Sequence, residues 1–314
     1  MTASFLAPRP ARGRLEVRGP QATAVLNGLL TNDVSTLAEG AGQWAAALTA
    51  KGRVIALLRV LRDEDRVLLD TDGAALPGLL AMLRKYVNPR LATVTDLSST
   101  SLACRVHGAG AAAALAPQVA CAVDELEALA PMGSRHGTVD GTPVVVVRSP
   151  ACAAPGFEVI GPTTTIKRLI GVLAATGWAT AAADALETER ILAGVPTWGS
   201  DMTEETIAQE AALDTLGALA FAKGCYTGQE VVARIHFRGH VNRLLRRLRA
   251  ASPLAVGAVV RDAAGTEVGD VRSSISTAEG SLAIAMVRRE VPPGDTVRVI
   301  SESGEAPAIV EALH

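Results

Sequence analysis

The sequence predicts an α+β fold that ends in a small antiparallel β-barrel. Up to about residue 240, segments with the two-residue alternation of strands take turns with segments of helical periodicity. After His240 the pattern changes to short alternating strands, separated by turn-forming clusters at Asp262–Gly265 and Pro292–Asp295. We therefore expect residues 241–314 to form the barrel. Residues 1–240 should form α+β lobes, and periodicity alone leaves open whether these are one or two.

The elements of the first hundred residues follow from local patterns. Leu15 and Val17 lie on one side of an expected strand, and Pro20 suits the first turn of the helix that follows. Leucines at helical spacing between Leu76 and Val87 predict an amphipathic helix that Pro89 ends. The expected strands are Arg14–Arg18, Trp44–Leu48, Val54–Leu61 and Leu91–Asp96. One expected helix ends at Leu30, and the other spans roughly 75–87.

The middle of the chain continues this alternation. A strand Leu102–His107 precedes an alanine-rich helix, and Asp140-Gly141 between valine-rich segments is typical of a hairpin turn. A helix around Ile166–Leu173 should end at Gly177. Asp184 and Glu187 have the spacing of a capping box, which predicts a further helix that runs to Leu192.

Composition excludes several classes of protein. The 314 residues carry a net charge of −2, so no bulk attraction to nucleic acid or to an anionic membrane is expected. No apolar run approaches the roughly 20 residues that span a bilayer, and no signal peptide is recognisable. The four cysteines are scattered, which predicts neither a disulfide framework nor a local metal site. We expect a cytoplasmic monomer with no resident metal.

The most informative segment consists of Lys223, Gly224, Cys225, Tyr226, Thr227, Gly228, Gln229 and Glu230. Thr227 with Glu230 has the spacing of a capping box, which predicts that a helix begins at Thr227. A thiol just before that helix, with Lys223 nearby, is expected to have a lowered pKa and to be reactive. The alternative is that Thr227 and Glu230 only cap a helix and that Cys225 is a packed residue. The flanking glycines favour an accessible, reactive Cys225.

These eight residues resemble the signature of the YgfZ family, which is related to the glycine-cleavage T protein and to mitochondrial iron–sulfur assembly factors. Segments 28–34 (G-L-L-T-N-D-V), 155–159 (P-G-F-E-V) and 187–194 (E-T-E-R-I-L-A-G) resemble T-protein motifs in the same order. The resemblance covers most of the chain. It implies three lobes around a central opening that holds a folate, with residues 1–240 forming two interleaved α+β lobes.

The resemblance also implies which residues bind the folate. In the relatives, the glutamate of the G-F-E motif, here Glu158, accepts the paired donors of the pterin ring, as a carboxylate can. The arginine of the last motif, here Arg190, lines the same pocket, and the T-N-D segment contributes Asn32 and Asp33. Without the resemblance, Glu158 would be an exposed strand residue and Arg190 a helix-surface partner of Glu187.

Two departures from the T-protein pattern concern its chemistry. The aspartates of the T-protein's G-G-x-x-D-D motif fall on Ala56 and Leu57, which cannot interact with the folate nitrogen as a carboxylate would. The folate-contacting tyrosine falls on Ala151. We therefore expect the fold and the cavity to be retained and aminomethyl transfer to be lost.

A basic run lies at the expected junction with the barrel. It could bind tRNA or another polyanion, but Phe237 is its one interleaved aromatic residue, and we favour charges that are paired with acidic residues elsewhere in the chain. A third possibility is that some of these arginines hold the carboxylates of a folate tail. The run consists of Arg234, His236, Arg238, His240, Arg243, Arg246, Arg247 and Arg249.

Taken with the departures, the resemblance implies a folate-binding accessory protein that supports assembly or repair of iron–sulfur clusters in client enzymes, including tRNA-modifying enzymes. Its cofactor would be tetrahydrofolate or a derivative. Its partners would be iron–sulfur client or assembly proteins, with no direct nucleic-acid contact and no membrane. The alternatives are a tetrahydrofolate-dependent aminomethyl- or methyltransferase, and a scaffold in which folate only stabilises the fold.

Overall fold

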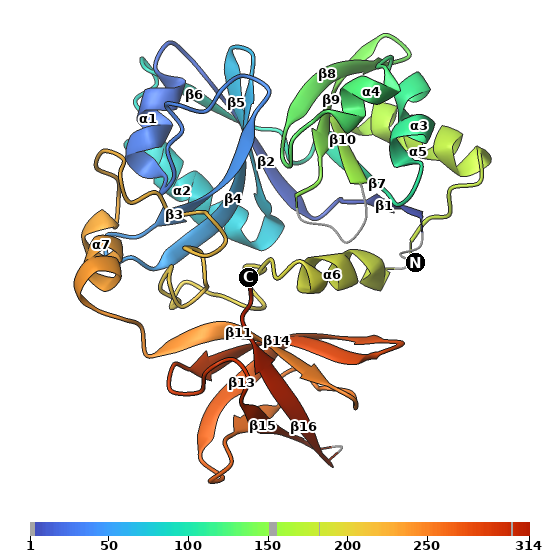
Figure 1. The fold of residues 1–314 in the computed structure, drawn as a ribbon. Helices are drawn as coiled ribbons and strands as arrows, with labels where there is room; N and C mark the ends of the chain where they lie inside the picture. The colour runs from blue at the N-terminus through green and yellow to red at the C-terminus, as the bar shows by residue number, and fades with distance from the viewer. Residues whose placement is uncertain (1–3, 151–155, 182, 303) are drawn as a thin grey trace.

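The protein consists of two α+β lobes side by side and a β-barrel beneath them (Figure 1). The structure is a computed structural model and describes residues 4–150, 156–181, 183–302 and 304–314. Helix α6 (Ala183–Leu192) runs between the upper lobes and the barrel. The predicted α+β fold with a C-terminal antiparallel barrel is confirmed.

The first lobe is a five-stranded antiparallel sheet in the order β3-β4-β5-β2-β6. Because side chains alternate along each strand, one face of this sheet is apolar and the other carries Arg14, Arg59 and Asp70 in a row across neighbouring strands. The strands are β2 (Arg12–Arg18), β3 (Gly42–Leu48), β4 (Val54–Asp63), β5 (Arg66–Asp72) and β6 (Thr93–Asp96), and the helices are α1 (Ala22–Leu29), the 3-10 turn η1 (Gly73–Ala75) and α2 (Leu76–Tyr86).

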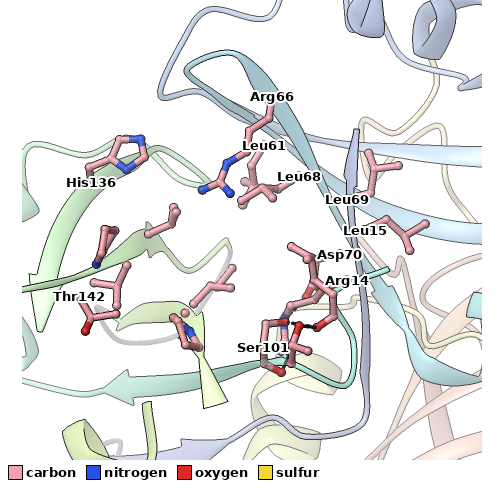
Figure 2. Close-up of a pocket in the computed structure, with 18 residues that line it drawn as sticks. Arg14, Leu15, Leu61, Arg66, Leu68, Leu69, Asp70, Ser101, His136 and Thr142 are labelled. Atoms are coloured by element: carbon pink, nitrogen blue, oxygen red, sulfur yellow. Dashed lines mark hydrogen bonds and ion pairs between the residues drawn. The ribbon is translucent and has the colours of Figure 1, made fainter. Parts of the chain in front are cut away.

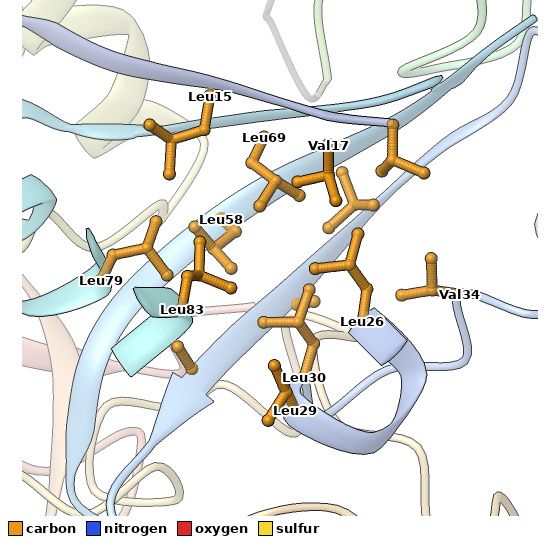
Figure 3. Packing of buried hydrophobic residues seen from close by; sticks show 14 of the residues in the cluster. Leu15, Val17, Leu26, Leu29, Leu30, Val34, Leu58, Leu69, Leu79 and Leu83 are labelled. Atoms are coloured by element: carbon orange, nitrogen blue, oxygen red, sulfur yellow. The ribbon is translucent and has the colours of Figure 1, made fainter. Parts of the chain in front are cut away.

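Helices α1 and α2 cover the apolar face of this sheet (Figure 3). Leu26 of α1 and Leu83 of α2 are fully buried against strand residues such as Leu58. A buried leucine stabilises the fold by roughly 1.5–3 kcal/mol through removal of its apolar surface from water. This packing fixes the apolar face towards the helices and therefore turns the charged face towards the second lobe.

The second lobe is another five-stranded antiparallel sheet, in the order β1-β7-β10-β9-β8. Its edge strand β1 precedes the whole first lobe in the sequence, so the two lobes are interleaved. The predicted hairpin turn is confirmed, since Asp140 and Gly141 have φ angles of 48° and 75° between β8 and β9. The elements are β1 (Phe5–Pro8), β7 (Ser101–His107), α3 (Ala111–Leu115), η2 (Ala116–Gln118), α4 (Val123–Glu127), β8 (Ser134–Val139), β9 (Thr142–Arg148), β10 (Gly156–Pro162) and α5 (Thr163–Ala175).

The third lobe is a closed six-stranded barrel in the order β11-β14-β13-β12-β15-β16. Its interior is filled by aliphatic side chains that include Leu248, Val287 and Val310. Helix α7 (Gln229–Arg238) comes just before it in the chain. The strands are β11 (Arg243–Ala250), β12 (Val259–Arg261), β13 (Glu267–Thr277), β14 (Gly280–Arg288), β15 (Thr296–Ser301) and β16 (Gly304–Glu311).

Candidate functional site

A cavity of about 260 Å³ lies between the two α+β lobes and helix α6. We call it the central cavity. Trp44 and Leu57 supply apolar wall, and Asp72, Glu187 and Glu189 supply carboxylates. Its basic residues are five arginines from separate parts of the chain, namely Arg9, Arg12, Arg59, Arg105 and Arg190. The central cavity is therefore lined by charges of both signs, with one apolar side.

Glu158 lies behind this wall rather than in it. Its carboxylate is completely buried, and its Oε2 accepts a hydrogen bond from Arg9 Nη1 at 2.5 Å. Its Oε1 accepts from Arg59 Nη2, and Arg105 Nη2 lies 3.7 Å from Oε2. Any action of Glu158 on a ligand would therefore pass through these three arginines, which do line the central cavity.

The charges of this cluster are mutually stabilising. Burial by itself would raise the pKa of Glu158, but the positive charges of Arg59, Arg9 and Arg105 outweigh it and hold the pKa well below its usual value. Burial lowers the pKa of Arg9 to about 10, which still leaves Arg9 charged at neutral pH. Asp70 adds a second buried carboxylate that accepts hydrogen bonds from Arg59 Nε and Nη2. Both carboxylates are therefore ionised and hold the arginine side chains in place.

Arg190 joins helix α6 to the barrel. Its Nε donates to Glu187 at 2.7 Å, and its Nη2 donates to Glu187 and to Ser273 of β13. Its Nη1 donates to the carbonyl oxygen of Val195 and to Asp201. An arginine has five N–H donors, and all five are used within the protein. A ligand that accepts a hydrogen bond from Arg190 would have to displace one of these partners.

Asn32 and Asp33 do not line the central cavity but shape the loop beside it. The Asn32 side-chain amide donates to the carbonyl oxygens of Trp44 and Gly217, at 2.8 and 2.9 Å. The Asp33 carboxylate accepts from the backbone and the hydroxyl group of Ser35. Asn32 thus fixes the backbone at Trp44, whose side chain is part of the cavity wall.

Three buried polar atoms around the central cavity have no hydrogen-bond partner among the described residues. They are Arg59 Nη1, Arg105 Nε and Glu189 Oε2. The other oxygen of Glu189 lies 3.4 Å from Nε2 of His107. Because an unpaired buried polar group is costly, these atoms mark where a ligand or water would find donors and an acceptor.

The sequence contained a signal for these residues that motif matching missed. Arg59 interrupts the apolar strand β4, and Arg105 interrupts β7. A charge in the middle of an apolar strand needs a buried partner of opposite sign, which Glu158 provides for both. Arg9 gave no comparable signal, since it lies outside a strand.

The positions of the T-protein aspartates are apolar in the structure too. Ala56 is fully buried in the core of the first lobe. Leu57 is 4% exposed and forms part of the wall of the central cavity. Strand β4 therefore directs no carboxylate into the central cavity from these two positions. Ala151, at the position of the T-protein tyrosine, lies outside the described residues.

The predicted helix start at Thr227 is wrong. Helix α7 begins at Gln229, its N-cap is Gly228, and no side chain in the described ranges caps it. Gly228 has a φ of 86°, and a Cβ atom there would lie 2.6 Å from the carbonyl oxygen of Thr49. This close approach to β3 sets the turn, so Thr227 cannot act as the cap. Glu230 instead forms an exposed ion pair with Arg234.

Lys223 is also used differently from the prediction. Its Nζ donates to the carbonyl oxygens of Asn27, Leu30 and Asn32, at 2.6, 2.8 and 2.8 Å. These carbonyls lie at the end of α1, where a helix leaves acceptors unpaired. Burial lowers the pKa of Lys223 to about 8. Lys223 therefore attaches the motif to the first lobe, and Cys225 is left exposed to solvent.

Much of the basic run is paired, as we favoured. Arg243 forms an ion pair with Glu210 at 2.9 Å, and Arg247 and Arg249 share Glu311. Among the described residues, no group of three or more His, Cys, Asp or Glu side chains is arranged to hold a metal ion. No helix in the described ranges is long and apolar enough to cross a membrane.

Comparisons with known proteins agree with the fold. The protein-family model described as the GCVT N-terminal domain matches residues 11–220 of the chain. The chain is 28% identical over 303 residues to the tRNA-modifying protein YgfZ of Cronobacter sakazakii, which covers 95% of the chain and 88% of that protein. It is 28% identical over 302 residues to a mitochondrial iron–sulfur cluster assembly factor of Homo sapiens, with 89% and 76% covered. The glycine cleavage system aminomethyltransferase T of Bartonella henselae has a similar fold, with a TM-score of 0.87, 22% identity, and 99% and 85% of the chains covered.

Proposed function

The chain belongs to the family of the GCVT N-terminal domain, with YgfZ proteins among its relatives, and from this premise we propose that it is a folate-binding accessory protein. It supports the assembly or repair of iron–sulfur clusters in client enzymes, including enzymes that modify tRNA. The names of two relatives support this role, one a tRNA-modifying protein and one an iron–sulfur cluster assembly factor. We expect it to act as a monomer in the cytoplasm.

The observation that carries the proposal is that Leu57, at the position of a T-protein aspartate, is part of the apolar side of the central cavity. Proton handling at a reacting nitrogen needs a titratable group within hydrogen-bond reach, and neither Leu57 nor Ala56 supplies one. The cavity itself is retained, and two arginines and a carboxylate around it each have an atom with no hydrogen-bond partner in the described part of the chain. An accessory protein that diverged from a transferase would keep the ligand site and lose the T-protein's catalytic aspartate.

The groups around the central cavity fit a tetrahydrofolate. Arg59 Nη1 and Arg105 Nε have no hydrogen-bond partner among the described residues, and they are donors of the kind that binds the carboxylates of a folate tail. Glu189 Oε2 accepts no hydrogen bond from a described residue and could accept from the donors of a pterin ring, to which Trp44 and Leu57 offer an apolar surface. When bound, the folate would supply one-carbon or redox chemistry. The protein's own residues would orient it, with Glu158 and Arg190 holding the cavity in shape and Asn32 and Asp33 supporting its rim.

Cys225 is the group that we propose faces the client proteins. It is exposed and lies in the motif that the chain shares with the YgfZ family, while its neighbour Lys223 is bound to α1. An exposed thiol on a segment attached at both sides can meet a large partner, which a group inside the central cavity cannot. Its role would be in reaction or cluster contact rather than in folding.

Calorimetric titration with tetrahydrofolate tests the ligand. The wild-type protein should bind one equivalent, and Arg105→Gln should weaken binding more than tenfold, because Arg105 lines the cavity and is held by Glu158 only at 3.7 Å. Ala193→Phe should weaken it too by filling the cavity without removing a charge. The matched control is Arg168→Gln, on the exposed outer side of α5. Equal binding by all four proteins would disprove the site.

Two activity measurements separate the proposal from the transferase alternative. Wild-type protein should restore the activity of iron–sulfur enzymes in a strain that lacks its own YgfZ-type protein, and Arg105→Gln should restore less. With lipoylated carrier, ammonia and methylenetetrahydrofolate, we expect no glycine-cleavage exchange above background. Turnover comparable to that of an aminomethyltransferase would establish the alternative instead.

A further inference from the structure

A second cavity, of about 390 Å³, lies between the sheets of the two α+β lobes. We call it the interlobe cavity, and Figure 2 shows the side chains around it. Leu61 and Leu68 of the first sheet face Val145 and Ile160 of the second, and all four belong to one buried cluster. A cavity of this size with aliphatic walls is typical of small-molecule sites, which span roughly 300–1,000 Å³.

One end of the interlobe cavity carries charges that are already paired. His136 and Arg66 lie together there (Figure 2). Arg66 donates to Glu16 at 2.7 Å and also pairs with Asp63. His136 Nε2 lies 2.5 Å from the other oxygen of Asp63. These groups therefore offer little net charge to an incoming ligand, and they form a polar rim.

The other end contains two buried polar atoms that form an ion pair with each other but no hydrogen bond to a described residue. Asp70 and Arg14 are 2% and 4% exposed and meet Ser101 at this end (Figure 2). Asp70 Oδ1 accepts from Arg12 and Arg59, whereas Oδ2 faces Arg14 Nε at 3.4 Å. That separation is too long for a good hydrogen bond, and neither atom has another partner among the described residues. The floor of the cavity thus contains one acceptor beside one donor, both covered until a ligand parts them.

This floor selects the charge of a ligand's polar group. A carboxylate placed there would pair with Arg14 but be repelled by Asp70, and an ammonium group would pair with Asp70 but be repelled by Arg14. A neutral primary amide meets both requirements, because its N–H can donate to Asp70 Oδ2 while its carbonyl oxygen accepts from Arg14 Nε. We propose that the interlobe cavity binds a small amphipathic molecule that has an apolar body and a neutral head group with both a donor and an acceptor.

Methyl NMR with three probes of equal chain length tests this proposal. Octanamide, octanoate and octylammonium are titrated at pH 7 into the full-length protein with labelled Leu, Val and Ile methyl groups. Octanamide should shift the methyl signals of Leu61, Leu68, Val145 and Ile160 and should bind at least fivefold more tightly than either charged probe. Because a charged head group is costly to bury in any apolar cavity, a fourth probe is needed: N,N-dimethyloctanamide, which is neutral but cannot donate a hydrogen bond, should also bind at least fivefold more weakly than octanamide.

Two variants locate the binding. Val145→Phe should abolish the octanamide shifts, because the larger ring occupies the cavity. The matched control Val172→Phe changes a residue of α5 that is 41% exposed, and it should leave the shifts unchanged. Octanoate binding as tightly as octanamide would overturn the proposal, as would shifts that survive Val145→Phe. A wild-type protein whose wall methyls do not respond to octanamide would also overturn it.

Discussion

Replacing Glu158 by glutamine should destabilise the whole protein, although it changes only one oxygen to nitrogen. The buried carboxylate faces three guanidinium groups, from Arg9, Arg59 and Arg105. Removing one partner of a buried ion pair costs about 3–5 kcal/mol, because the remaining charge is left uncompensated. The glutamine oxygen can still accept one hydrogen bond, so we expect the lower part of this range. For 314 residues, with an unfolding entropy of about 2.1 cal/mol/K per residue, a loss of about 3 kcal/mol lowers Tm by roughly 4–5 °C.

The same substitution should change the pH dependence of stability. The folded pKa of Glu158 lies well below its usual value, so the folded state binds fewer protons than the unfolded state at acidic pH. The stabilisation is therefore fully present above the unfolded value of about 4.3 and is lost as pH falls below it. The difference in unfolding free energy between wild type and Glu158→Gln should be constant from pH 7 to about 5 and should shrink at lower pH.

Urea unfolding between pH 3 and 7 measures both effects. The matched control is Glu305→Gln, since Glu305 is 47% exposed and lies 3.5 Å from Arg298. An exposed pair of this kind contributes about 0–1 kcal/mol. A loss below about 1 kcal/mol for Glu158→Gln, or a difference that grows as pH falls, would refute the claim that Glu158 is an ionised counter-charge for the arginines.

Two further predictions concern the shared motif. Cys225 should react with iodoacetamide faster than Cys104 and Cys121. Burial raises the pKa of Cys104 to about 12 and also raises the pKa of Cys121. Slower labelling of Cys225 would contradict its exposed placement. Cys225→Ser should keep its Tm within a few degrees and still fail to restore client enzyme activity, and full restoration would make its role structural. Lys223→Met should lower the free energy of unfolding by about 1–3 kcal/mol in urea, because three carbonyl oxygens lose their donor. The alkylation rate of Cys225 in Lys223→Met should stay within about twofold of the wild-type rate. A larger change would support the effect of the Lys223 charge on the Cys225 thiol that the sequence predicted.

Local patterns in the sequence were sufficient for much of the fold. The alternation in β4, the leucines of α2 and the Asp140-Gly141 turn are each determined by residues that are close in sequence. Strand β5 escaped this reasoning, because Arg66, Asp70 and Asp72 break its apolar pattern. The partners that make those charges tolerable, such as Arg12 and Arg59, lie on other strands.

The candidate site was less predictable than the fold. Motif matching identified Glu158 and Arg190, but the contacts of Glu158 come from residues 149 and 99 positions away. No local rule indicates which arginine will meet a given carboxylate at such a separation. The capping rule failed at Thr227 for a related reason, since the approach of Gly228 to Thr49 decides the turn.

The position of β1 has a consequence for the order in which the protein is made. Phe5 pairs with His107 at the edge of the second sheet, and Leu6 is bonded to the backbone of Ala179 and Ala181. A ribosome adds about 5–20 residues per second, so β7 is made roughly 5–20 s after β1. The segment around Ala179 and Ala181, which bonds to Leu6, is made later still. Meanwhile the complete first lobe can emerge and fold. A fusion placed before β1 should therefore disturb completion of the second lobe, although the first lobe is its neighbour in the sequence.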